Sequence, residues 1–184
     1  MIFNRHLDLK GQHAFLSASK YSWIRYTPEK LEESFLNYTA AQRGTELHDF
    51  ARRCIALGVN LPKANRTLNL YVNDAIRYEM TPEQTLYYSP NCFGTADAIS
   101  FRRKLLRIHD LKTGVSTPAS FDQLAIYAAL FCLEYGQKPD KIDMELRIYQ
   151  FDQCQIYNPH PEEVSGIMST IVDFDRRIEE LKGE

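Results

Sequence analysis

The sequence has no long apolar run, no closely spaced cysteines and no repeat or linker-like segment. No stretch approaches the roughly eighteen apolar residues that cross a bilayer. The first ten residues also lack the apolar centre of a secretion signal. We therefore expect a protein that has no membrane partner and works in the cytoplasm or another reducing compartment.

The four cysteines are dispersed along the chain, at Cys54, Cys92, Cys132 and Cys154. The closest two are 22 residues apart, whereas zinc and iron–sulphur sites usually contain cysteines about two to four residues apart. Disulfides are not expected without a secretion signal. The cysteines are interpreted as small buried apolar residues, and no iron–sulphur cluster is expected.

Without a linker or repeat, the 184 residues are expected to form one domain, 1–184. An apolar content of 44% and a charged content of 25% are typical of a soluble globular chain that can bury a core. Within it we expect an N-terminal helical part at about 14–80 and a part with a sheet and helices at about 84–184.

The net charge of −2 excludes a uniformly basic protein that coats nucleic acid, but the charge is unevenly distributed. Residues 101–114 hold five basic side chains against one acid, and residues 41–66 hold five against two. Residues 161–184 hold seven acids against three bases. This asymmetry permits a positive groove on one side, although charged runs are more often solvated faces.

Helix signals dominate the first part of the chain and strand signals follow. Thr27-Pro28-Glu29 is typical of a helix start, and Gly58 of a helix end. The expected helices are 27–38, 40–57, 66–79 (closed by Thr81-Pro82), 119–135 and about 161–181. The expected strands are 84–89, 93–101, 105–111 and 142–151, with Arg102-Arg103-Lys104 as a hairpin turn. The fold class is therefore α/β, a small mixed sheet flanked by helices with extra N-terminal helices.

Two carboxylates and a lysine are expected to meet on neighbouring strands. Asp110 and Lys112 are two residues apart at a strand end, so they share one face while Leu111 points into the core. The hairpin brings Asp97 beside Asp110. Paired carboxylates among apolar residues repel unless a cation or proton lies between them, and oxygen ligands suit Mg²⁺ or Mn²⁺. Surface pairing of these three residues is the alternative, and the more common meaning of a bare Asp-x-Lys.

Two helical pairs add to this pattern. Gly44 lies four residues before His48, which leaves space beside the imidazole. Gln123 and Tyr127 are also four residues apart, on the helix after the Asp-x-Lys strand. Taken alone, His48 would be a histidine at the edge of the core and Tyr127 an ordinary core aromatic.

Together these segments resemble the RecB-like branch of the PD-(D/E)xK nuclease superfamily. The matching pieces are Gly44-Thr45-x-x-His48, Gly94-x-x-Asp97, His109 to Gly114 and Gln123-x-x-x-Tyr127, in the family's order. Residues 16–21 resemble the start of the family's first helix. The resemblance covers about residues 14–157 and implies a restriction-endonuclease-like core with the order α-β-β-β-α-β.

The resemblance also implies roles for these residues. His48, Asp97 and Asp110 would bind Mg²⁺ or Mn²⁺ with the Leu111 carbonyl, and Lys112 would orient water and stabilise the transition state. Site support and DNA contacts would come from Gln123, Tyr127, Glu46, Arg102 and Arg103. The cysteine pattern of the iron–sulphur members is missing. The P-loop of a helicase is also missing. The chain would therefore act alone, as a homo-oligomer or with a separate recombination protein.

The function implied is metal-dependent hydrolysis of DNA phosphodiester bonds by an exonuclease in recombination, repair or replication. The setting implied is the cytoplasm of a bacterial or phage-infected cell. Three alternatives stay open: a structure-specific endonuclease or nickase, a non-catalytic DNA-binding module that keeps the fold, and a zinc hydrolase. Zinc sites generally contain more nitrogen and sulphur ligands than this set provides.

Overall fold

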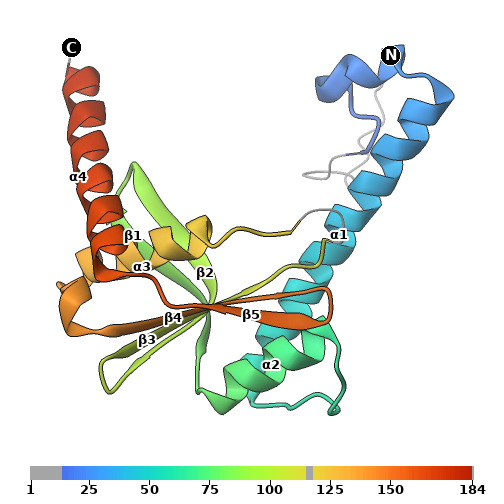
Figure 1. The fold of residues 1–184 in the computed structure, drawn as a ribbon. Helices are drawn as coiled ribbons and strands as arrows, with labels where there is room; N and C mark the ends of the chain where they lie inside the picture. The colour runs from blue at the N-terminus through green and yellow to red at the C-terminus, as the bar shows by residue number, and fades with distance from the viewer. Residues whose placement is uncertain (1–13, 115–117, 184) are drawn as a thin grey trace, which may run out of the picture. The chain divides into compact units, whose positions relative to one another are not determined.

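The computed structural model describes residues 14–114 and 118–183 (Figure 1). The chain forms two compact units, Met1–Thr45 and Glu46–Glu184. The boundary between them falls inside a helix. The predicted change from helices to a sheet near residue 80 is present, between the helix that ends at Arg77 and the strand that begins at Thr81. All the residues expected to bind metal belong to the second unit.

The first unit holds a short 3₁₀ helix and the start of a long α-helix, α1 (Pro28–Leu57). The 3₁₀ helix spans Ala18–Arg25, in the segment expected to begin the first helix. Thr27 caps α1, because its hydroxyl oxygen accepts a hydrogen bond from the Lys30 amide at 3.3 Å. Phe15 packs edge-on against Phe35, with ring centroids 5.3 Å apart.

The expected break near Tyr38 is wrong, since α1 continues without interruption to Leu57. Neither proline nor glycine stands between Tyr38 and Ala40, so nothing there ends the helix. The expected end at Gly58 is confirmed. Gly58 has a φ of 67°, and the Val59 amide donates back to the Cys54 carbonyl at 2.9 Å, as in a Schellman cap.

The second unit is built around one five-stranded sheet with the strand order β1-β2-β3-β4-β5. Its strands are β1 (Thr81–Ser89), β2 (Cys92–Arg102), β3 (Leu105–Leu111), β4 (Asp143–Gln150) and β5 (Gln153–Tyr157). Strands β3 and β4 are parallel, and the other neighbours are antiparallel. The predicted α/β class with a mixed sheet flanked by helices is confirmed.

Helices cover both faces of this sheet (Figure 1). On one face, α3 (Asp122–Glu134) and α4 (Pro161–Gly183) enclose a core that includes Leu86, Leu106 and Ile108. On the other, the end of α1 and α2 (Thr67–Arg77) pack over Ala98, Leu111 and Tyr149. Helix α3 connects β3 to β4, as a parallel pair requires.

Three element bounds differ from expectation for identifiable reasons. Strand β1 begins at Thr81, since Pro82 is tolerated on an edge strand and does not close a helix. Helix α3 begins at Asp122, three residues later than expected. Strand β5 was missed: its turn, Phe151-Asp152, adopts left-handed φ values of 54° and 56° without a glycine. The Asp152 carboxylate stabilises this turn by accepting the Thr67 amide at 2.8 Å.

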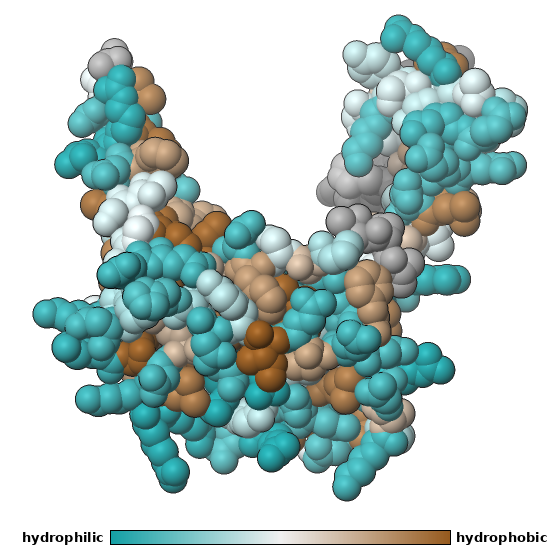
Figure 2. Space-filling view, in the orientation of Figure 1, coloured by the Kyte–Doolittle hydropathy of each residue, from teal (hydrophilic) through white to brown (hydrophobic). Residues whose placement is uncertain are grey.

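Helix α4 packs on the sheet through its first half and extends past it in its second. Val164 is buried, whereas Phe174 and Leu181 are exposed, and apolar side chains follow the projecting part of the helix (Figure 2). The β1-β2 turn is tied to α4, since Ser89 donates to Asp175 at 2.6 Å. In the parts of the chain that the structure describes, no helix has the length and apolar character needed to span a bilayer.

Candidate metal centre

Asp97 lies where strand pairing is interrupted on both sides of β2. Towards β3, regular pairing ends at Ala98 and His109, so the two strands separate at Asp97 and Asp110. Towards β1, pairing is broken around Glu83, whose backbone φ of 51° is unusual for a residue other than glycine. At this point the backbones of β1 and β3 do not pair regularly with Asp97.

The Asp97 carboxylate occupies this fork. Its Oδ2 accepts a hydrogen bond from the Leu111 amide at 2.9 Å. In a regular sheet such an amide would donate to a backbone carbonyl of the neighbouring strand. The same oxygen lies 3.5 Å from Nδ1 of His48 on α1. Asp97 therefore links β2, β3 and α1, as the sequence pattern predicted.

Glu83 joins His48 and Asp97 in a compact donor group. One ligand atom from each lies within 4.8 Å of the other two. Glu83 was not predicted, because the expected strand began at Gln84, three residues after the observed start at Thr81. Strand pairing contained the signal: with Gln84 opposite Ala96 and Pro82 opposite Ala98, Glu83 comes beside Asp97.

Asp110, which was expected to join His48 and Asp97, does not belong to this donor group. It lies beside Lys112 on the same side of β3, as predicted. The Lys112 ammonium lies 3.1 Å from Oδ1 and 3.0 Å from Oδ2 of Asp110, and it donates to Oε1 of Gln123 at 2.9 Å. Among the described residues, nothing makes a well-directed hydrogen bond to Asp110 Oδ2, which is buried. The Lys112 ammonium is the cationic partner of this buried carboxylate.

The Gln123 and Tyr127 pair supports the lysine from α3. The Gln123 amide donates to the Tyr127 hydroxyl at 3.1 Å. Gly94 makes this approach possible, since a Cβ there would lie 2.9 Å from the Tyr127 ring. The glycine of the Gly-x-x-Asp segment thus admits the aromatic ring beside the site.

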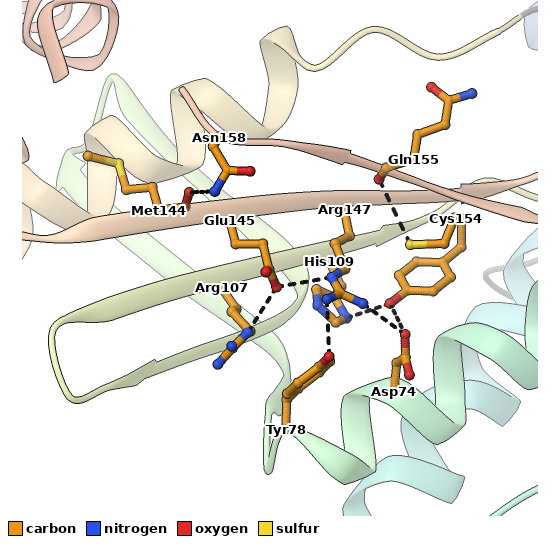
Figure 3. Close-up of polar contacts among 11 residues, drawn as sticks. Asp74, Tyr78, Arg107, His109, Met144, Glu145, Arg147, Cys154, Gln155 and Asn158 are labelled. Carbon is orange, nitrogen blue, oxygen red and sulfur yellow. Dashed lines mark hydrogen bonds and ion pairs between the residues drawn. The ribbon is translucent and has the colours of Figure 1, made fainter. Parts of the chain in front are cut away.

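A buried polar network anchors β3 from the side of the sheet that α2 covers (Figure 3). His109 Nδ1 lies 3.3 Å from the Tyr149 hydroxyl, which donates to Asp74 at 2.8 Å. Arg147 also donates to Asp74, at 3.0 Å. Burial, with Arg147 and Arg107 nearby, lowers the pKa of His109 to about 3, so the ring is neutral and structural.

Both central carboxyls hold their protons more tightly than usual. Burial and the negative charge of Asp110 raise the pKa of Asp97 to about 6. Burial also raises the pKa of Asp110, although Lys112 opposes this shift. A divalent cation beside these carboxyls would favour their ionised forms and so lower both pKa values. The imidazole of His48 and the carboxylates of Glu83 and Asp97 are donors that fit Mn²⁺ or Mg²⁺.

Asp97→Asn should stabilise the metal-free protein above pH 6. The pKa of Asp97 is higher in the folded protein than in the unfolded chain, so folding favours the protonated carboxyl. The resulting stability is fully present below the unfolded-state pKa and is lost as the pH rises through about 6. Asparagine cannot ionise and still accepts from Leu111. The expected gain is up to about 3 kcal/mol, or roughly 6 to 12 °C in Tm.

Thermal melts in EDTA at pH 5 and pH 8 measure this effect. Asp49→Asn is the control, because Arg52 already lowers the pKa of that exposed carboxyl and no gain is expected. A Tm for Asp97→Asn that equals the unmutated value at pH 8 would contradict the assigned electrostatics.

Other predicted residues lie outside this cluster. Glu46 is exposed on α1 and does not belong to the donor group. Arg102 and Arg103 lie at the β2-β3 turn, at the opposite end of β3 from Asp110, and Arg102 pairs with Glu79. The structure does not bring these arginines to the site, so their contact with DNA stays a prediction. The role of the Leu111 carbonyl also stays a prediction, although the Leu111 side chain is buried as expected.

Comparison with models of known protein families, with curated proteins and with solved structures finds no match to this chain.

Proposed function

We propose that this chain is a divalent-metal-dependent nuclease that hydrolyses DNA phosphodiester bonds. The observation that carries the proposal is the fork in the sheet. There His48, Glu83 and Asp97 converge, and on the neighbouring strand the buried Asp110 carboxylate is paired with Lys112. Carboxylates with an adjacent lysine are suited to a reaction in which negative charge accumulates on a phosphate.

A bound Mg²⁺ or Mn²⁺ would activate water and neutralise charge on the scissile phosphate. The protein supplies the rest. Asp97 and Asp110 would hold the cation, with His48 on the α1 side and Glu83 on the β1 side. Lys112 would donate to the attacking water or to a non-bridging phosphate oxygen, and Gln123 would keep the ammonium directed into the site.

The order of elements supports the same proposal. Elements α2, β1, β2, β3, α3 and β4 follow one another in the order α-β-β-β-α-β, which the resemblance to the RecB-like nucleases implies. Exonuclease action is favoured over that of an endonuclease or nickase by that resemblance alone. A non-catalytic DNA-binding module would have no need of Lys112 held between Asp110 and Gln123.

The decisive test uses purified protein with end-labelled linear DNA and with covalently closed circular DNA. With Mg²⁺ or Mn²⁺, linear DNA should be degraded from its ends while closed circles persist, and EDTA should stop the reaction. Cutting of closed circles would instead indicate an endonuclease. Firm DNA binding without cleavage in either metal would favour the non-catalytic alternative.

A further inference from the structure

The face of the β1-β2 hairpin that carries Glu83 and Asp97 continues beyond the metal centre. Strand pairing places Thr85 opposite Thr95, and Tyr87 opposite Phe93. Successive residues of a strand alternate between faces, so these two pairs share the face opposite Leu86 and Ala96. Glu83 and Asp97 reach the same side, because both lie close to His48 on α1, which packs over that face. The pattern of exposure agrees, because Leu86 and Ala96 are fully buried on the α3 side of the sheet.

The outermost pair is aromatic and open to solvent. The rings of Tyr87 and Phe93 are stacked, with centroids 6.4 Å apart and an interplanar angle of 28°. Tyr87 is 47% exposed and Phe93 is 61% exposed. Aromatic faces presented to solvent are the surfaces on which unpaired bases stack.

The pair between the aromatics and the metal centre is polar. The Thr85 and Thr95 hydroxyls lie 3.0 Å apart and both residues are exposed. These hydroxyls interrupt the apolar surface, which makes the face a poor match for a lipid or for the apolar centre of a protein interface. An alternation of hydroxyls and aromatic rings fits a ligand that itself alternates sugar-phosphate and base.

The distance from the aromatic pair to the cation site also fits such a ligand. Each step of two residues advances about 6.7 Å along a strand, so Tyr87 and Phe93 lie about 13 Å from Glu83 and Asp97. A stacked nucleotide strand rises roughly 3.4 Å per residue. The aromatic pair is therefore within about four nucleotides of the metal centre.

We propose that this face binds single-stranded DNA and directs it to the metal centre, an inference that rests on the proposed function. Bases stack on Tyr87 and Phe93, and the hydroxyls of Thr85 and Thr95 contact the sugar-phosphate backbone. Residues 81–101 contain no lysine or arginine, so stacking, not phosphate pairing, provides the affinity of this face. A duplex cannot bind in the same way, because its base faces are covered by neighbouring base pairs.

The test measures DNA binding in EDTA, where no cleavage occurs, by fluorescence anisotropy of labelled single strands and of blunt duplexes. The double variant Tyr87→Ala/Phe93→Ala should bind single strands at least about 10-fold more weakly. Duplex affinity should change far less. The slope of affinity against salt should stay the same, because no phosphate contact is removed.

Two controls separate stacking from a general loss of apolar surface. Phe174→Ala removes an aromatic side chain on α4 that is 67% exposed, and it should leave single-strand affinity unchanged. Tyr87→Leu/Phe93→Leu keeps an apolar pair on the strands without aromatic faces, and it should bind as weakly as the alanine variant.

Unchanged single-strand affinity in the double variant would overturn the proposal. So would an equal loss for single strands and duplexes. These outcomes are distinct from failure of the proposed function: an unmutated protein that binds single strands through this pair but never cleaves with Mg²⁺ or Mn²⁺ would retain the binding face and lose the nuclease assignment.

Discussion

Replacing Asp110 with alanine is expected to abolish both metal binding and DNA cleavage. Asp110 contributes the buried oxygen that lacks a directed partner, and without it Lys112 would face the cation position uncompensated. Calorimetric titration with Mn²⁺ should show no site-specific heat, and cleavage should fall to background. The melting temperature in EDTA should not fall, because the variant removes a buried carboxyl whose pKa is raised by burial.

Asp143→Ala is the matched control for this variant. Asp143 is an exposed aspartate that begins β4, and it pairs with Leu105 at the far end of β3. It should bind Mn²⁺ and cleave DNA as the unmutated protein does. Metal binding that persists unchanged in Asp110→Ala would show that the cation site lies elsewhere.

Lys112→Ala is expected to lower cleavage by at least ~100-fold, by analogy with the loss of one preorganised donor. The ammonium is held by Asp110 and Gln123, so it is in place before the reaction begins. Its contribution should be greatest when charge develops in the transition state. DNA affinity should fall far less, because one phosphate contact among several is removed. Metal binding should persist or tighten.

Single-turnover cleavage, DNA binding in EDTA and Mn²⁺ titration together measure the three effects. Lys104→Ala is the control, since that lysine lies in the turn at the other end of β3 and should not affect the rate. Equal cleavage by the unmutated protein and Lys112→Ala would show that Lys112 is an ordinary surface lysine.

Sequence patterns predicted the parts of the fold where local chemistry and tertiary structure agree. Strand β3 has its predicted bounds, Leu105–Leu111, because a segment rich in leucine and isoleucine lies between turn-forming residues. The turn at Arg103-Lys104 was expected from polarity. The turn at Phe151-Asp152 was not, because the contacts that stabilise it come from Thr67, distant in the sequence.

The candidate site shows the same division. His48, Asp97, Asp110 and Lys112 could be identified because each belongs to a segment with a recognisable spacing. Glu83 could not, since its position depends on the register between β1 and β2 and on a left-handed backbone. No local spacing specifies a register, so a ligand supplied by strand pairing becomes visible only in three dimensions.

The irregular edge of the sheet also bears on solubility. Strand β1 is an edge strand, and a regular edge offers a row of free amides and carbonyls onto which another chain can add. Here Pro82 has no amide to offer, and the turned backbone at Glu83 interrupts the row. The Tyr87 amide is already occupied by the Glu134 carboxylate, at 2.8 Å. The distortion that brings Glu83 to the metal centre therefore also makes β1 a poor template for intermolecular β-aggregation.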